Sequence, residues 1–228
     1  MVLALAGGMV AAFCTGNLAV ELLRRLHVAG FNSPDDFGSV LLATLSFHGA
    51  AIVAGILFLK FHHISWREIA GLDTMRWHRQ LLLAVFLLLA VVPVMFDLKC
   101  LSEILISKTG SEVTYQRAVE MISSTKSPWL KGYLMFSAVV LAPVAEEFFF
   151  RGLFFSGLKK LGWPKCAWLV SSFLFAAIHF NLPTFLPLFV FALALTWLYE
   201  RTEGLLAPML AHSLFNAANL VILFAQNR

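Results

Sequence analysis

Charged residues are scarce in this 228-residue sequence. Asp, Glu, Lys and Arg make up 13% of it, about half the share that is usual in soluble domains. Apolar residues make up 60%, and the mean hydropathy is +0.81. This balance excludes an ordinary soluble domain and predicts a polytopic membrane protein.

Cysteine is scarce as well, with three residues far apart in the chain: Cys14, Cys100 and Cys166. They form no CxxC pair or metal-knuckle spacing, so they indicate neither a cysteine-based zinc site nor a redox compartment. No Lys or Arg precedes Arg24, so the first apolar run lacks the basic start of a cleavable signal peptide. We expect that run to be retained as a span.

Seven apolar runs predict an all-α transmembrane helical bundle of about seven spans, forming one membrane domain over residues 1–228. The runs are residues 2–23, 38–59, 80–96, 133–158, 164–180, 183–199 and 205–224. Between them, residues 97–128 are expected to form an extramembrane loop with a short amphipathic helix. Its apolar face would carry Tyr115, Ala118, Val119 and Ile122, opposite Glu112, Gln116 and Glu120.

The formal net charge is +4, and the basic residues cluster in the loops. Lipid headgroups and membrane orientation account for that pattern, so lipid is an expected partner and nucleic acid is not. The short basic loops at 60–79 and 159–165 are expected on the cytoplasmic side.

Three charges interrupt the apolar run at 133–158: Glu146, Glu147 and Arg151. A charge at mid-membrane costs about 2.5 to 3.5 kcal/mol on insertion scales, so pairing, water access or function must offset it. Glu147 and Arg151 are four residues apart and share a helix face, which favours an ion pair and leaves Glu146 free. Pro143 removes a backbone hydrogen bond one turn earlier.

Other polar side chains occur on the apolar helices that follow. His179 lies one turn after Phe175, whose ring is expected to orient the imidazole. His212 and Asn216 form a polar stripe on the last span. A lone His48 in the second span is expected to be a hydrogen-bonding group between helices rather than a catalyst.

If these groups lie close together, they provide the catalytic groups that a hydrolase needs: a carboxylate to accept a proton from water, an imidazole to hold that water, and donors for an oxyanion. Three other interpretations stay open. The polar groups could join helices, they could line a transporter or proton channel, or they could belong to a scaffold or immunity protein without turnover.

The three motifs Glu-Glu-x-x-x-Arg (146–151), Phe-x-x-x-His (175–179) and His-x-x-x-Asn (212–216) resemble those of the CPBP family of intramembrane proteases. That family includes CAAX prenyl endopeptidases and bacterial abortive-infection and bacteriocin self-immunity proteins. The resemblance covers about residues 130–224, which would be the catalytic core.

The resemblance implies that Glu146 activates water beside His179, and that His212 and Asn216 form the oxyanion pocket. Glu147 and Arg151 would support the helix and its charge balance. The implied activity is hydrolysis of a peptide bond in a membrane-associated protein or peptide. The implied location is the inner (cell) membrane of a bacterium. A prenylated substrate does not follow from family membership.

Zinc is the alternative cofactor, because Glu146, His179 and His212 would make a two-histidine, one-glutamate set with a position open for water. Against it, no His-Glu-x-x-His pair presets two ligands on one helix, and the two histidines lie on separate spans. We therefore expect no metal cofactor.

Overall fold

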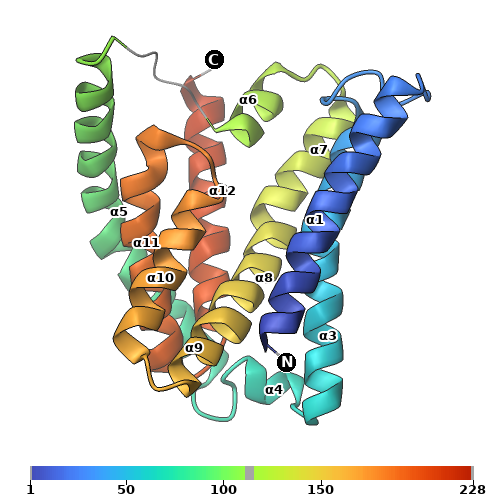
Figure 1. The fold of residues 1–228 in the computed structure, drawn as a ribbon. Helices are drawn as coiled ribbons and strands as arrows, with labels where there is room; N and C mark the ends of the chain where they lie inside the picture. The colour runs from blue at the N-terminus through green and yellow to red at the C-terminus, as the bar shows by residue number, and fades with distance from the viewer. Residues whose placement is uncertain (1, 111–115, 227–228) are drawn as a thin grey trace.

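The computed structural model describes residues 2–110 and 116–226, and every regular element within them is helical. The helices run back and forth along one bundle (Figure 1). The N-terminus lies at the same end as α4, and the C-terminus lies at the opposite end. The all-α fold predicted from composition is confirmed.

The first helix and a bent second helix lie along one side of the bundle (Figure 1). They comprise α1 (Val2–Arg25), α2 (Phe37–Thr44), the π-helical turn η1 (Leu45–Gly49) and α3 (Ala50–His62). Helix α1 approaches η1 closely, since a Cβ built on Gly16 would lie 1.8 Å from Ser46 Oγ. Small residues allow such close approach of membrane helices.

The third long helical segment extends further than the sequence predicted. After the short helix α4 (Trp66–Ile69), α5 extends over Trp77–Ser107, whereas the apolar run was expected to end at Phe96. Charged residues do not stop this helix, because Lys99 and Glu103 pair at 3.7 Å across one turn.

A short helix, α6 (Arg117–Ser124), follows within residues 97–128. It buries Ile122, which is 1% exposed, in a cluster with Leu130 and Leu134. Tyr115 and Glu112, which were expected on this helix, lie outside the described residues.

The next long helical segment, called the fourth rod below, carries the paired glutamates and alternates between α-helix and π-helix. Its parts are α7 (Pro128–Phe136), η2 (Ser137–Leu141), α8 (Ala142–Glu147), η3 (Phe148–Phe155) and α9 (Ser156–Lys160). The two glutamates therefore lie between two π-helical segments, which occur frequently at functional sites.

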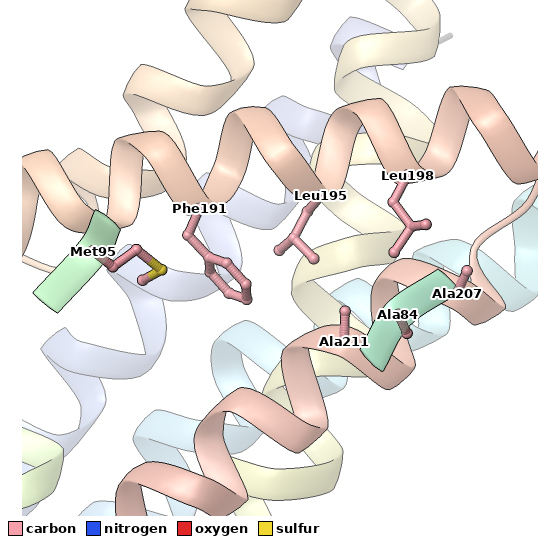
Figure 2. Packing of buried hydrophobic residues seen from close by; sticks show 7 residues of the cluster. All are labelled: Ala84, Met95, Phe191, Leu195, Leu198, Ala207 and Ala211. Carbon is pink, nitrogen blue, oxygen red and sulfur yellow. The ribbon is translucent and has the colours of Figure 1, made fainter. Parts of the chain in front are cut away.

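Three helices complete the bundle: α10 (Pro164–Ala177), α11 (Leu182–Thr202) and α12 (Leu206–Gln226). The cluster in Figure 2 joins α11 to α5 and α12. Three large side chains of α11 pack against Met95 and three alanines of the neighbouring helices, and the alanines allow the backbones to approach closely. The cluster consists of Ala84, Met95, Phe191, Leu195, Leu198, Ala207 and Ala211.

Among the residues that the structure describes, five helical segments are long and apolar enough to cross a membrane, so the chain is an integral membrane protein. They are Phe37–His62, Trp77–Ser107, Pro128–Lys160, Leu182–Thr202 and Leu206–Gln226. Helix α10 has 14 residues, and neither it nor α1 is among the five. The expected count of about seven spans is therefore not confirmed, although the bundle is polytopic.

One buried amide ties the loop after α3 to the start of α12. Gln80 Nε2 donates to the carbonyl oxygens of Ala70, Gly71 and Met75 at 2.9 to 3.1 Å, and Gln80 Oε1 accepts from the Ala207 N–H at 3.1 Å. Because Gly71 has φ +70 and packs on Gly204, a side chain at either position would collide with backbone. This contact fixes the start of α12, the helix that carries His212.

Candidate active site

Glu146 and Glu147 end helix α8 in the interior of the bundle. Their exposed fractions are 7% and 0%. Isolated charges at this depth would be unstable, so the groups that face the two carboxylates decide what each can do.

One carboxylate oxygen of Glu147, Oε1, accepts hydrogen bonds from two side chains. Arg151 Nη1 donates to Glu147 Oε1 at 2.9 Å, and His212 Nδ1 lies 2.9 Å from the same oxygen. Arg151 Nη2 also donates to the Ala192 carbonyl at 2.9 Å. The structure contains the Glu147–Arg151 pair that the four-residue spacing predicted, and it adds His212 as a third member.

Phe175 packs against three of the predicted site residues at once. Its ring centroid lies 4.8 Å from the Arg151 guanidinium, 5.1 Å from the His179 ring and 5.6 Å from the His212 ring. Phe175 is fully buried. The ring therefore orients His179, as its spacing suggested, and also separates the charge cluster from the apolar core.

The histidine hydrogens follow from these contacts. His179 Nδ1 lies 2.7 Å from the Phe175 carbonyl oxygen, which can only accept, so Nδ1 carries the hydrogen. The same reasoning places a hydrogen on His212 Nδ1, since an ionised Glu147 carboxylate only accepts. In both neutral rings Nε2 then remains as the free ring nitrogen.

Glu146 lies between two imidazoles. Its Oε2 atom is 4.0 Å from His212 Nε2, and its Oε1 atom is 3.6 Å from His48 Nε2. His179 also interacts electrostatically with this carboxylate. Within the described residues, Oε2 is buried and has no hydrogen-bond partner. Oε2 of Glu147 is also buried without a hydrogen-bond partner among these residues, but the other oxygen of Glu147 is bound by Arg151 and His212. The imidazole nitrogens that face Glu146 lie at 3.6 and 4.0 Å, so Glu146 is the less tightly held carboxylate of the two.

Asn216 is placed one turn after His212, where it faces the backbone of the fourth rod. Its Nδ2 donates to the Ala138 carbonyl at 2.8 Å. In the π-helical pattern of η2, the N–H of residue 143 would bond to this carbonyl, but Pro143 has no N–H. Asn216 thus satisfies the carbonyl that the proline leaves free, and its second amide hydrogen remains for another partner.

The sequence analysis did not place His48 in the site. It was expected to lie between helices, and the structure does place it against another helix, but its neighbour there is Glu146 of the site, and 19% of the His48 side chain is exposed. The only signal in the sequence was a lone ionisable group on an apolar span, which by itself does not say which helix it faces.

The three side chains of the zinc alternative, Glu146, His179 and His212, are not arranged as a metal-ligand group. Among residues 2–110 and 116–226, no group of three His, Cys, Asp or Glu side chains is arranged to hold a metal ion. His212 and His179 each use Nδ1 in a hydrogen bond to the protein, so only Nε2 of each ring remains for a ligand.

Comparison with known proteins finds a family that part of the chain resembles. Residues 128–218 match the family described as type II CAAX prenyl endopeptidase Rce1-like, which confirms the resemblance predicted from the three motifs. The matched segment includes Glu146, His179, His212 and Asn216 and excludes His48.

Two curated proteins of Lactococcus lactis subsp. lactis (strain IL1403) are similar to the chain. The UPF0177 protein YaiF is 28% identical over 149 residues, which cover 63% of each protein. The UPF0177 protein YxdF is 30% identical over 78 residues, which cover 34% of this chain and 42% of that protein. The chain spans less than two thirds of the length of either relative. No solved structure matches.

Replacement of Arg151 by Ala is expected to destabilise the protein by about 3 to 5 kcal/mol, because it leaves the buried Glu147 charge without its partner. Thermal unfolding in detergent micelles measures the effect. Glu146→Gln should unfold close to the wild-type temperature, and Lys159→Ala, which removes an exposed ion pair with Glu200, should cost at most about 1 kcal/mol. Equal stability of Arg151→Ala and Lys159→Ala would show that the buried pair does not stabilise the fold.

Proposed function

We propose that this protein is an intramembrane endopeptidase that hydrolyses a peptide bond of a membrane-associated protein or peptide with water activated by Glu146. The observation that carries the proposal is the buried carboxylate of Glu146, whose Oε2 atom faces His212 Nε2 at 4.0 Å without a hydrogen bond, while Arg151 pairs with the neighbouring Glu147. The match of this segment to a family of endopeptidases supports the same reaction class.

In the proposed reaction, Glu146 Oε2 accepts a proton while the water oxygen bonds to the substrate carbonyl carbon. His179 lies beside this carboxylate and holds the water through its free Nε2 atom. Negative charge then develops on the substrate carbonyl oxygen. When the tetrahedral intermediate collapses, the C–N bond breaks and Glu146 returns the proton to the leaving amine, so atoms and charges balance.

Stabilisation of the oxyanion is assigned to His212 and Asn216. Asn216 has one amide hydrogen beyond the one bonded to Ala138. His212 donates from Nε2 only when its ring carries both hydrogens, and the Glu147 carboxylate at 2.9 Å balances that positive charge. Arg151 in turn offsets the charge of Glu147. Glu147 and Arg151 thus support the reaction without touching the substrate.

The proposed substrate class is supported by the position of the site inside apolar helices that are long enough to cross a membrane. The family description names prenyl endopeptidases, but the site geometry contains no assigned lipid pocket, so a prenyl group is not part of the proposal. The bacterial relatives support a location in a bacterial cell membrane.

The Glu146→Gln protein is expected to be folded and inactive, because the amide keeps the volume of the side chain but cannot accept a proton from water. The measurement compares peptide termini of membrane proteins, by mass spectrometry, between cells with the wild-type protein and cells with Glu146→Gln. New termini should occur with the wild-type protein alone.

Asn216→Ala is expected to lose activity in part, measured with purified protein on a synthetic peptide that copies a cleavage sequence found by the comparison of termini. Removal of one oxyanion donor should lower kcat by about 10² to 10³ with a small change in KM. Identical termini in the wild-type and Glu146→Gln cells would contradict the proposal and favour a transporter or a scaffold. A rise in KM alone for Asn216→Ala would contradict the oxyanion role.

The proposed chemistry uses no metal ion, because Glu146 itself accepts the proton from water, and among residues 2–110 and 116–226 no group of three His, Cys, Asp or Glu side chains is arranged to hold one. Purified protein should contain well under one zinc per chain by elemental analysis, and its activity should survive phenanthroline. Stoichiometric zinc whose removal and return switch activity off and on would show that the zinc alternative is correct.

A further inference from the structure

The helix that carries His48 lies outside the segment that matches the endopeptidase family, yet it brings an imidazole to the centre of the site. His48 lies in the π-helical turn η1, between α2 and α3. A π-helical turn inserts one extra residue and changes the direction in which the following side chains point. The turn therefore contributes to aiming His48 toward α8.

Close packing of α3 on the fourth rod holds that imidazole in place. Ala51 and Ala145, both fully buried, belong to one hydrophobic cluster that includes Phe149. At Gly55, an added Cβ would lie 2.9 Å from the Phe148 ring, so only a glycine fits. These small residues bring the two backbones together where His48 meets Glu146.

The two oxygens of Glu146 have different surroundings. Oε1 lies 3.6 Å from His48 Nε2, and Oε2 lies 4.0 Å from His212 Nε2. His48 Nδ1 is buried and finds no hydrogen-bond partner among the described residues, so nothing there favours a hydrogen on Nδ1. A carboxylate only accepts, which favours the hydrogen on Nε2.

We propose that His48 is a positioning residue, which holds Oε1 of Glu146 through its Nε2 hydrogen and leaves Oε2 as the atom that accepts the proton from water. The inference rests on the proposed function of the same site. The separation of 3.6 Å is longer than a finished hydrogen bond, and catalytic hydrogen bonds in substrate-free structures are often long and tighten in the complex.

Two amide variants separate this role from simple packing. In His48→Gln the side-chain amide nitrogen reaches the place of the imidazole Nε2, whereas in His48→Asn it reaches only the place of Nδ1. The substrate is a synthetic transmembrane peptide that copies a cleavage sequence found by the comparison of membrane peptide termini. His48→Gln should keep kcat within about 3-fold, and His48→Asn should lower kcat by about 10-fold or more with KM unchanged.

Each kinetic outcome decides the inference. Equal kcat for the wild-type protein and both variants would overturn it. An equal loss of kcat in His48→Gln and His48→Asn would overturn it too. If His48→Asn does not fold in detergent, His48→Met provides the comparison without a donor. When Glu146→Gln is inactive but both amide variants are fully active, the inference fails and the proposed function stands. Turnover by Glu146→Gln would instead contradict the proposed function.

The ring hydrogen is also measurable without substrate. In protein labelled with ¹⁵N at histidine, the ring shifts of His48 are assigned by their loss in His48→Gln. A neutral ring with hydrogen on Nε2, or a doubly protonated ring, agrees with the inference. A neutral ring with its hydrogen on Nδ1 would overturn it, whatever the activity of the protein.

Discussion

The bundle depends on how it accommodates the carboxylate of Glu147. This group is fully buried among apolar helices, and one of its oxygens receives both Arg151 and His212 at 2.9 Å. Loss of either partner would leave charge in a medium of low dielectric, which costs several kcal/mol. The contact joins the fourth rod to α12, and the Arg151 bond to Ala192 joins it to α11. Glu147 and its partner Arg151 therefore connect the fourth rod to both α11 and α12.

That arrangement sets the chemistry of the neighbouring glutamate. With Glu147 neutralised by Arg151, His212 keeps its Nδ1 atom on Glu147 and turns Nε2 toward Glu146. Phe175 packs against Arg151, His179 and His212. Glu146 is left without an arginine partner, in a buried site where its oxygens face imidazoles at 3.6 and 4.0 Å. In such a site proton acceptance and oxyanion stabilisation are more effective than in solution.

The sequence predicted the parts of this site whose geometry is local. The four-residue spacing of Glu147 and Arg151 was enough to predict their pair, and the same spacing predicted the contact of Phe175 with His179. The all-helical fold and the family resemblance followed from hydropathy and from three motifs.

The remainder depends on contacts between distant segments, which periodicity does not specify. His212 contacts Glu147 across 65 positions, and Asn216 contacts Ala138 across 78. The position of His48 depends on a π-helical turn, for which a hydropathy pattern has no signal. Helix α5 passed its predicted end because an ion pair on one turn made charged residues compatible with the helix.

The central claim is that Glu146 activates water directly. The most direct measurement is a single turnover by purified protein in liposomes, in H₂¹⁸O, on a cleaved membrane peptide, with hydroxylamine present as a trap. The account predicts that the new carboxyl group carries one ¹⁸O and that no hydroxamate forms, because water attacks without an acyl-enzyme intermediate. Capture of the product as a hydroxamate would contradict it, since that result requires a nucleophile from the protein.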